Sequence, residues 1–321
     1  MSAFLGVDVA KESLDVTLWD EKERKRRKHL ANKPAGFEQL DAWLQRHTEG
    51  EVHVCMESTS VYWEELAEHL HQAGYQVSVV NPARIRGYAM SQMRRSKTDP
   101  LDGDVIVDFC RSQRPSLWTP PTAEQRQLRA LVRHRVALQK SRTQQLNRLA
   151  TSRDPEVKAS LQRLIATLEA EIEGIEARLE TFFDEHPPLK AKRDLLTSIP
   201  GIGEKTATHI LAEMYDLDQY ENAKAVAADA GITPSHYRSG TSVRRRSKMS
   251  RMGKAAIRGT LHFPAITAIQ HNPVVRQLAR RLEARGKPPG VIRVAAMRKL
   301  MHLAFGVLRH QQPFDPAYAA S

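Results

Sequence analysis

Four carboxylates in the first third of the sequence have the types and positions that can hold divalent metal ions. They stand at the ends of expected strands or in one expected helix: Asp8, Glu57, Asp99 and Asp102. Hard cations such as Mg²⁺ take carboxylate oxygens and keep waters that a substrate phosphate can replace. Asp99 and Asp102 are three residues apart, so a helix that begins near Asp99 places both on one face. The four acids therefore suggest metal-dependent chemistry on phosphate esters.

A serine in a strongly basic tract is the candidate nucleophile. Ser239 stands within ten residues of five cations: Arg238, Arg244, Arg245, Arg246 and Lys248. A serine hydroxyl becomes a good nucleophile when a base or metal takes its proton and cations stabilise the charge of the transition state. Ser239-Gly240 is also an ordinary turn sequence, and the spacing alone favours this second interpretation. Ser242 is the next candidate nucleophile.

Asp99 and two neighbouring acids also have a structural explanation. Asp99 precedes a proline and is a normal helix N-cap, while Asp104 and Asp108 on the same expected helix are expected in solvent or in ion pairs rather than at a metal. Asp8 is harder to explain, because an acid in an apolar strand costs several kcal/mol unless it is paired or metal-bound. Asp15 is likewise an acid in an expected apolar strand, unless the alternation of side chains places it on the solvent face.

The composition favours a polyanionic partner and a soluble, cytoplasmic protein. The net charge is +12 and the sequence pI is about 9.8, and each phosphate that such a protein neutralises releases counterions. No stretch approaches the roughly 20 apolar residues that span a bilayer, and the N-terminus does not resemble a signal peptide. We therefore expect no membrane partner. The two cysteines, Cys55 and Cys110, support neither a disulfide framework nor a cysteine zinc site.

The first third of the chain predicts a mixed α/β sheet. Short β-branched or alternating runs predict strands at residues 3–9, 13–19, 24–29, 52–56 and 76–80. Apolar residues at helical spacing predict helices at residues 34–47, 61–73 and 82–93. Strands that alternate with helices after an initial meander are typical of an α/β domain.

Two long helices are predicted next, at residues 122–150 and after Asp154-Pro155. Apolar residues of the second recur at spacings of three and four, as in a coiled-coil seam: Leu161, Leu164, Leu168, Ile172, Ile175 and Leu179. This seam needs a partner, which is either the preceding helix or another subunit. The prolines at 187 and 188 end the segment.

The remainder of the chain predicts a basic, mostly helical unit. Gly201 and Gly203 form a turn that opens a helix to about Met214, and backbone amides at such a helix N-terminus can hold a DNA phosphate, with Lys205 beside them. From residue 232 to 310, seventeen Lys and Arg stand against one acid, Glu283. Because these cations are interleaved with apolar residues at helical spacing, we expect amphipathic helices with a cationic face.

A series of motifs resembles, in order, the DEDD-type insertion-sequence transposases, the bridge-RNA-guided serine recombinase family. The matching segments are residues 6–11, 56–59, 81–82, 97–102, 199–203 and 239–240, followed by 249–254 and Arg258. The resemblance covers nearly the whole chain. Each motif alone is weak, but the combination is highly specific.

The resemblance implies three parts. Residues 1–120 would form a RuvC-like, RNase H-type metal-binding domain of α/β class. Residues 121–188 would form coiled-coil helices for dimerisation, and residues 189–321 a mostly α-helical transposase domain with a helix-hairpin-helix-like element and a nucleophilic serine.

The resemblance also implies the roles of the site residues. The metal-binding acids of the family fall on Asp8, Glu57, Asp99 and Asp102, with Mg²⁺ as the expected metal and Mn²⁺ as an alternative, and its nucleophile falls on Ser239. The serine would form a covalent phosphoserine link to DNA in a composite site, with acids and serine from different subunits. A structured noncoding RNA would specify donor and target DNA, on a dimer that assembles into a tetramer.

We therefore expect an RNA-guided DNA recombinase that mobilises its own insertion element. Its expected nucleic-acid contacts lie in the basic tract and the glycine turn: Arg244, Arg245, Arg246, Lys248, Arg251, Lys254, Arg258, Gly201, Gly203 and Lys205. One alternative is a RuvC-like nuclease or junction-processing enzyme with water as nucleophile, which leaves free ends rather than a protein adduct. Another is a basic scaffolding protein, which would not explain Asp8.

Overall fold

The computed structural model describes residues 2–58, 60–92, 99–235, 238–239, 243–244, 248–249 and 253–317. For residues 99–102, 235, 238–239, 243–244 and 248 it describes the backbone alone. The chain divides into two compact units, Met1–Pro121 and Thr122–Ser321. The further division at residues 120 and 188 stays a prediction. Within the described ranges, none of the helices is both long and apolar enough to cross a membrane.

A five-stranded sheet forms the centre of the first unit. Its strands are β1 (Ala3–Val9), β2 (Ser13–Trp19), β3 (Lys25–Ala31), β4 (Val52–Glu57) and β5 (Gln76–Val80). They lie in the order β3-β2-β1-β4-β5, with antiparallel pairing of β1 with β2 and β2 with β3, and parallel pairing of β1 with β4 and β4 with β5. The expected mixed α/β class is thereby confirmed.

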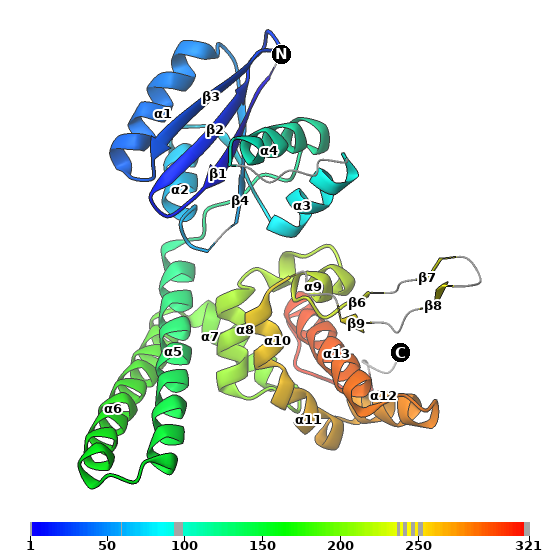
Figure 1. Ribbon diagram of the computed structural model, residues 1–321. Coiled ribbons are helices and arrows are strands. Elements are labelled where there is room, and N and C mark those ends of the chain that lie inside the picture. The colour runs from blue at the N-terminus through cyan, green and yellow to red at the C-terminus, as the bar shows by residue number, and fades with distance from the viewer. Residues whose placement is uncertain are drawn as a thin grey trace. The chain divides into compact units, whose positions relative to one another are not determined.

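Helices cover both faces of this sheet (Figure 1). They are α1 (Pro34–His47), α2 (Glu64–Gln72), α3 (Pro82–Ser91) and α4 (Asp99–Gln113). Side chains alternate along β1, so that Leu5 and Val7 pack with α1 and α2, whereas Phe4 packs with α3 and α4. The strand β1 is therefore buried on both faces, as its nearly continuous apolar sequence requires.

Helix α4 lies directly on β1 because residue 6 is glycine. A Cβ atom at residue 6 would lie 2.4 Å from the amide nitrogen of Val107 and 2.5 Å from the carbonyl oxygen of Gly103. Both neighbours are backbone atoms of α4, which cannot turn aside as a flexible side chain can. The absence of a side chain at Gly6 therefore determines how closely α4 approaches the sheet.

The second unit begins with a hairpin of two long helices, α5 (Ala123–Thr151) and α6 (Pro155–Glu185), which pack along each other (Figure 1). Thr122 starts α5 with a capping box, and Asp154 caps the N-terminus of α6. In the predicted seam Leu161 and Leu179 are buried, whereas Leu164 is 44% exposed. The preceding helix is therefore a partner of the seam within the same chain.

The rest of the second unit is a cluster of helices around α13. The elements are α7 (Pro187–Thr197), α8 (Glu204–Glu213), the 3₁₀ helix η1 (Leu217–Gln219), α9 (Ala223–Asp229), α10 (Ala255–Thr260), α11 (His262–His271), α12 (Pro273–Ala284) and α13 (Pro289–His310). Helix α13 packs against α7, α9, α11 and α12. Leu300 and Met301 on α13 share one core with Leu128 of α5 and Phe183 of α6, so the base of the hairpin belongs to this unit.

For residues 232–310 we had expected amphipathic helices, but the first part of this basic tract is not helical. It begins with two antiparallel strand pairs, β6 (Pro234–Ser235) with β9 (Lys248–Met249) and β7 (Arg238–Ser239) with β8 (Val243–Arg244). Ser, Thr and Gly are poor helix formers, and like charges at helical spacing repel one another, so this stretch does not favour a helix. Residues 234–249 are called the serine segment below.

Replacement of Gly6 tests the contact between α4 and β1. Gly6→Ala should lower the free energy of unfolding by about 1–3 kcal/mol, because the new methyl group overlaps backbone atoms of α4. Gly87→Ala in α3 is the control, since a Cβ there meets no atom within 4 Å and alanine is the better helix former. Urea denaturation of both variants measures the difference, and equal stabilities would contradict the proposed contact.

Candidate active site

Asp8 and Glu57 stand side by side at the same edge of the sheet. The parallel strands β1 and β4 pair Val7 with Met56, and the next residue on each strand is Asp8 or Glu57. Neighbouring strands lie about 4.8 Å apart, and side chains in register point to the same face. Both carboxylates are half-buried. The first two predicted metal ligands are therefore adjacent, on the face of the sheet that α4 covers.

The last turns of α4 lie near the beginning of β1. The thiol of Cys110 donates a weak hydrogen bond to the carbonyl oxygen of His53, at 3.5 Å. His53 is the register partner of Phe4 on β1. The C-terminal half of α4 thus lies over the early residues of β1.

The first turn of α4 must then lie at the opposite end, where β1 finishes. A Cβ atom at Gly103 would lie 3.5 Å from the carbonyl oxygen of Asp15, and Asp15 is the register partner of Asp8. Helix α4 begins four residues before Gly103, at Asp99. The helix therefore runs antiparallel to β1 and brings its N-terminus to the end of the sheet that carries Asp8 and Glu57.

The side chains of Asp99 and Asp102 lie outside the described residues. Among the side chains that are described, no group of three or more His, Cys, Asp or Glu is placed to hold a metal ion. The arrangement nevertheless fits a magnesium site. Two adjacent carboxylates stand at the end of the sheet where the N-terminus of α4 lies, and the sequence of that first turn includes Asp99 and Asp102. Carboxylate oxygens are the ligands that Mg²⁺ prefers.

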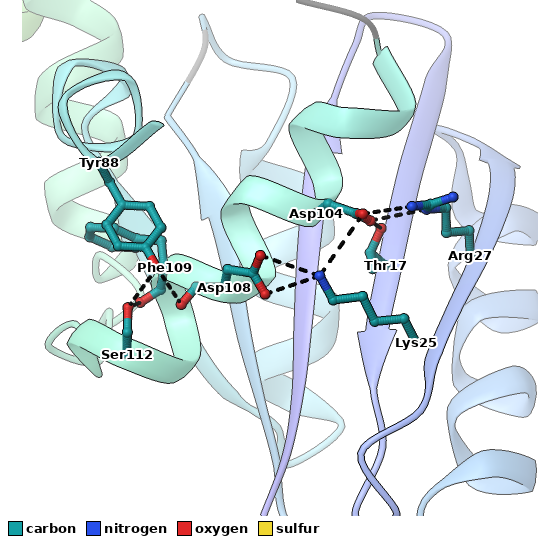
Figure 2. A network of polar contacts seen from close by, with 8 residues as sticks. All are labelled: Thr17, Lys25, Arg27, Tyr88, Asp104, Asp108, Phe109 and Ser112. Carbon is teal, nitrogen blue, oxygen red and sulfur yellow. Dashed lines mark hydrogen bonds and ion pairs between the residues drawn. The ribbon is translucent and has the colours of Figure 1, made fainter. Parts of the chain in front are cut away.

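Asp104, the other candidate on α4, is used in an ion pair. Its buried carboxylate accepts hydrogen bonds from Arg27 Nε at 3.0 Å, from Arg27 Nη2 at 2.6 Å and from Thr17 Oγ1 at 3.1 Å (Figure 2). Lys25 Nζ lies 3.1 Å from Asp108 Oδ1 and 3.9 Å from Asp104 Oδ2. The expectation of ion pairing for Asp104 and Asp108 therefore agrees with their surroundings, and these pairs link α4 to β3.

The charge of Asp104 is stabilised by these contacts. Burial alone would raise the pKa of Asp104, but the hydrogen bond from Arg27 and the charge of Lys25 outweigh it and hold the pKa below its ordinary value of 3.8. The same bond raises the pKa of Arg27 above its ordinary value. The ion pair thus persists at neutral pH and ties the α4 backbone to the sheet.

The basic partners on β3 were not recognised from the sequence, although the sequence contained a signal. Lys25, Arg27 and His29 alternate along β3 and therefore share one face. They pair with Asp108, Asp104 and Asp15, with His29 Nδ1 2.8 Å from Asp15 Oδ1. Alternating cations on one strand opposite acids four residues apart on a helix could have predicted this packing.

The candidate nucleophile lies on a strand of the serine segment. Ser239 on β7 pairs with Val243 on β8, and three residues of sequence separate them. Arg244 is the register partner of Arg238, so basic residues stand on both strands of the pair. The backbone of Ser239 thus lies in a short, basic strand pair, and the turn predicted from Ser239-Gly240 falls on residues 240–242, which lie outside the described residues.

Several predicted nucleic-acid contacts fall on or near this segment. Arg245, Arg246 and Arg251 lie outside the described residues, and only the backbone of Arg244 and Lys248 is described. Lys254 Nζ donates to the carbonyl oxygen of Glu213 at 2.8 Å and lies 3.0 Å from Asp229 Oδ2. Arg258 Nη1 donates to the carbonyl oxygen of Gly253 at 3.2 Å. Lys254, which follows the serine segment in the sequence, therefore contacts both α8 and α9.

The glycine turn joins α7 to α8 as expected. Gly201 has φ +107° and lies against α11, where a Cβ would be 2.7 Å from the Cβ of Ala268, so packing alone requires glycine there. Gly203 precedes α8 in open space, without a side-chain cap for the first amides of the helix. Lys205 Nζ lies 2.5 Å from Glu176 Oε1. The turn also borders a shallow hollow with Phe263, whose side chain is 75% exposed.

Comparisons with known proteins identify relatives over nearly the whole chain. Residues 5–152 match a family model for DEDD-type transposases of IS110, described as "Transposase", and residues 193–280 match one described as "Transposase IS116/IS110/IS902 family". The "Pilin gene-inverting protein" of Moraxella bovis is 31% identical over 97% of both chains.

Two further relatives are transposases by name. The "Probable family 20 transposase" of Pseudomonas aeruginosa is 24% identical over 97% of this chain and 98% of its own length. The "Transposase for insertion sequence element IS1328" of Yersinia enterocolitica is 29% identical over 54% of this chain and 59% of its own length.

The Asp104 ion pair gives a prediction about acid stability. The pKa of Asp104 is lower in the folded protein than in the unfolded chain. The ion pair therefore stabilises the fold fully above about pH 4, and this stabilisation is lost as the pH falls through the folded-state pKa of Asp104. Asp104→Asn should lower the free energy of unfolding at pH 7 by about 1–3 kcal/mol and flatten its decline in acid.

Denaturant titrations across the acid range measure this effect. Glu12→Gln is the control, because the exposed Glu12 meets only the exposed Lys11, at 3.4 Å. If Asp104→Asn and Glu12→Gln lose stability in acid with the same pH profile as the unchanged protein, the ion pair does not stabilise the fold.

Proposed function

The chain belongs to the IS110 family of transposases, and we propose that it acts as the site-specific recombinase of an insertion sequence. The observation that carries this proposal is the convergence of Asp8, Glu57 and the N-terminus of α4 at one end of the sheet. Two carboxylates lie at that end of the sheet together with the first turn of a helix whose sequence supplies two more, Asp99 and Asp102, and a protein that only binds DNA would not need this arrangement. The relative named as a gene-inverting protein, similar over 97% of this chain, supports recombination as the reaction.

We propose that Asp8, Glu57, Asp99 and Asp102 hold Mg²⁺, for which Mn²⁺ is an alternative. When bound, the metal stabilises charge on phosphate oxygens and makes a hydroxyl easier to deprotonate. Lys25 and Arg27 hold Asp104 and Asp108 by ion pairs, which leaves the acids near the start of α4 for the metal. The mixed sheet with helices on both faces supports a RuvC-like, RNase H-type fold for this unit.

Ser239 is the proposed nucleophile. Its Oγ loses a proton and forms a bond to a DNA phosphorus, while the bond from that phosphorus to the leaving deoxyribose oxygen breaks and this oxygen gains a proton. The phosphate ester is thereby conserved as phosphoserine until a second strand end reverses the step. Arg244, Lys248 and Arg258 are the proposed cations that stabilise the phosphate charge.

The acids and the serine lie in different compact units. We propose that the acids of one subunit meet the serine of another, within a dimer that assembles into a tetramer on donor and target DNA. Exposed apolar residues on the hairpin helices support self-association, notably Val157 at 45% and Leu164 at 44% exposure. A structured noncoding RNA is the proposed source of target choice, since base pairing can replace sequence reading by the protein.

Removal of the acids tests the metal site. Asp8→Asn and Glu57→Gln should each lower DNA cleavage by about a hundredfold or more. Mg²⁺ should raise the Tm of the unchanged protein and should raise that of both variants much less, because a bound ligand stabilises the folded state.

Asp108→Asn is the matched control for the metal site. The substitution removes an acid of α4 that pairs with Lys25. The variant should keep the rise in Tm with Mg²⁺. Loss of that response in Asp108→Asn, or its survival in Asp8→Asn, would place the metal elsewhere.

Removal of the hydroxyl tests the nucleophile. Ser239→Ala should lower strand cleavage by several orders of magnitude and abolish the covalent protein–DNA adduct, while DNA binding changes little. Denaturing gels with labelled DNA detect the adduct, and Ser242→Ala should retain it. An adduct in Ser239→Ala would assign the role to another residue, whereas cleavage to free ends without any adduct would favour the nuclease that uses water.

A further inference from the structure

Five basic side chains on three packed helices of the second unit form a cluster, called the α13 basic cluster below. They are Lys224 on α9, Arg281 on α12, and Arg298, Lys299 and His302 on α13. Helix α13 packs against both α9 and α12, which brings these residues together from distant parts of the sequence. Arg281 acts electrostatically on Lys299, and Lys224, Arg298 and Lys299 act on His302.

Within the parts of the chain that the structure describes, no carboxylate is among the charged groups that shift the pKa of Lys299 or His302. Every charged neighbour that shifts the pKa of Lys299 or His302 is a cation. Elsewhere in the same unit cations do have partners: Arg178 lies 3.1 Å from Glu185, and Lys190 lies 2.6 Å from Asp184. The lack of balance is thus a property of this surface, beyond the basic composition of the chain.

The cluster costs the folded protein free energy. Burial and Arg281 lower the pKa of Lys299, and burial with three neighbouring cations lowers the pKa of His302 to about 4. His302 is therefore neutral at pH 7, and its buried Nε2 has no hydrogen-bond partner among the described residues. A fold that retains mutually repelling cations and an unsatisfied ring nitrogen indicates an external anion that offsets the cost.

The cluster extends beyond the reach of a single small anion. Lys224 and Arg281 are exposed on two different helices that both pack against α13, and further exposed cations are Arg276 and Arg280 on α12 and Arg285 directly after it. A polyanion with regularly repeated charges matches such a surface better than one phosphate ion does.

We propose that the α13 basic cluster binds the phosphate backbone of duplex DNA, at a surface distinct from the serine segment. The inference rests on the proposed function, because DNA is the substrate of a transposase. Contacts to the backbone position a duplex and carry no sequence information. The cluster would therefore hold DNA of any sequence while the serine segment acts on the site of exchange.

A triple variant tests the proposal by salt dependence. Lys224→Gln, Arg281→Gln and Lys299→Gln together should weaken binding of a short random-sequence DNA duplex about tenfold or more. The slope of log K against log salt should become shallower by about 2 to 3, because each phosphate contact contributes about 0.9. Fluorescence anisotropy at several salt concentrations measures both quantities.

The matched control removes the same number of charges from paired cations. Arg142→Gln, Arg178→Gln and Lys190→Gln together change the net charge equally, and each of these residues has a carboxylate partner. This control should keep nearly the full salt slope. If both triple variants lose the same slope, net charge explains the binding and the proposal is wrong.

Stability and RNA binding separate the remaining outcomes. Because the cluster residues repel one another, the cluster variant should have a Tm equal to or above that of the unchanged protein, and a large fall in Tm would indicate a structural role instead.

Weaker binding to an RNA duplex with unchanged binding to DNA would overturn DNA as the ligand. If the unchanged protein binds and cleaves DNA but the variant keeps its full salt slope, the inference fails alone. If the unchanged protein has no affinity for DNA, the proposed function fails as well.

Discussion

The close packing of α4 on β1 is the constraint on which the candidate site depends. Gly6 lets the backbone of the helix approach the strand, and the pair between Asp104 and Arg27 holds the helix at one register. A shift of α4 by one turn would carry its N-terminus about 5.4 Å along the sheet. The position of the α4 N-terminus at the end of β1 is therefore set by residues outside the candidate metal site.

Charge is used in two ways in this protein. In the first unit Lys25 and Arg27 are neutralised by acids on α4, and the result is rigid packing between a strand and a helix. In the second unit Arg281 lowers the pKa of Lys299, and the proposed role of such neighbouring cations is to bind a polyanion. Basic residues would thus serve packing where acids pair with them, and binding where they lie near other cations.

The two units carry different parts of the proposed active site. The first carries carboxylates on a rigid sheet, where their positions follow from strand register. The second carries Ser239 on a short strand pair beside a helical core. In the proposed composite site, nucleic acid and subunit contacts would bring the acids and the serine together, and cleavage would depend on assembly.

The sequence by itself determined the local elements and the residue types of the site. Alternation and helical spacing predicted the strands from Ala3 to Val80 and the long helices, because these patterns are set by which faces must be buried. The acids Asp8 and Glu57 were visible as carboxylates at strand ends. Only the tertiary structure decided that α4 runs antiparallel to β1, that Asp104 is bound by Arg27, and that the basic tract opens with strand pairs. These features depend on contacts between segments far apart in the chain, and neither local propensity nor periodicity contains that information.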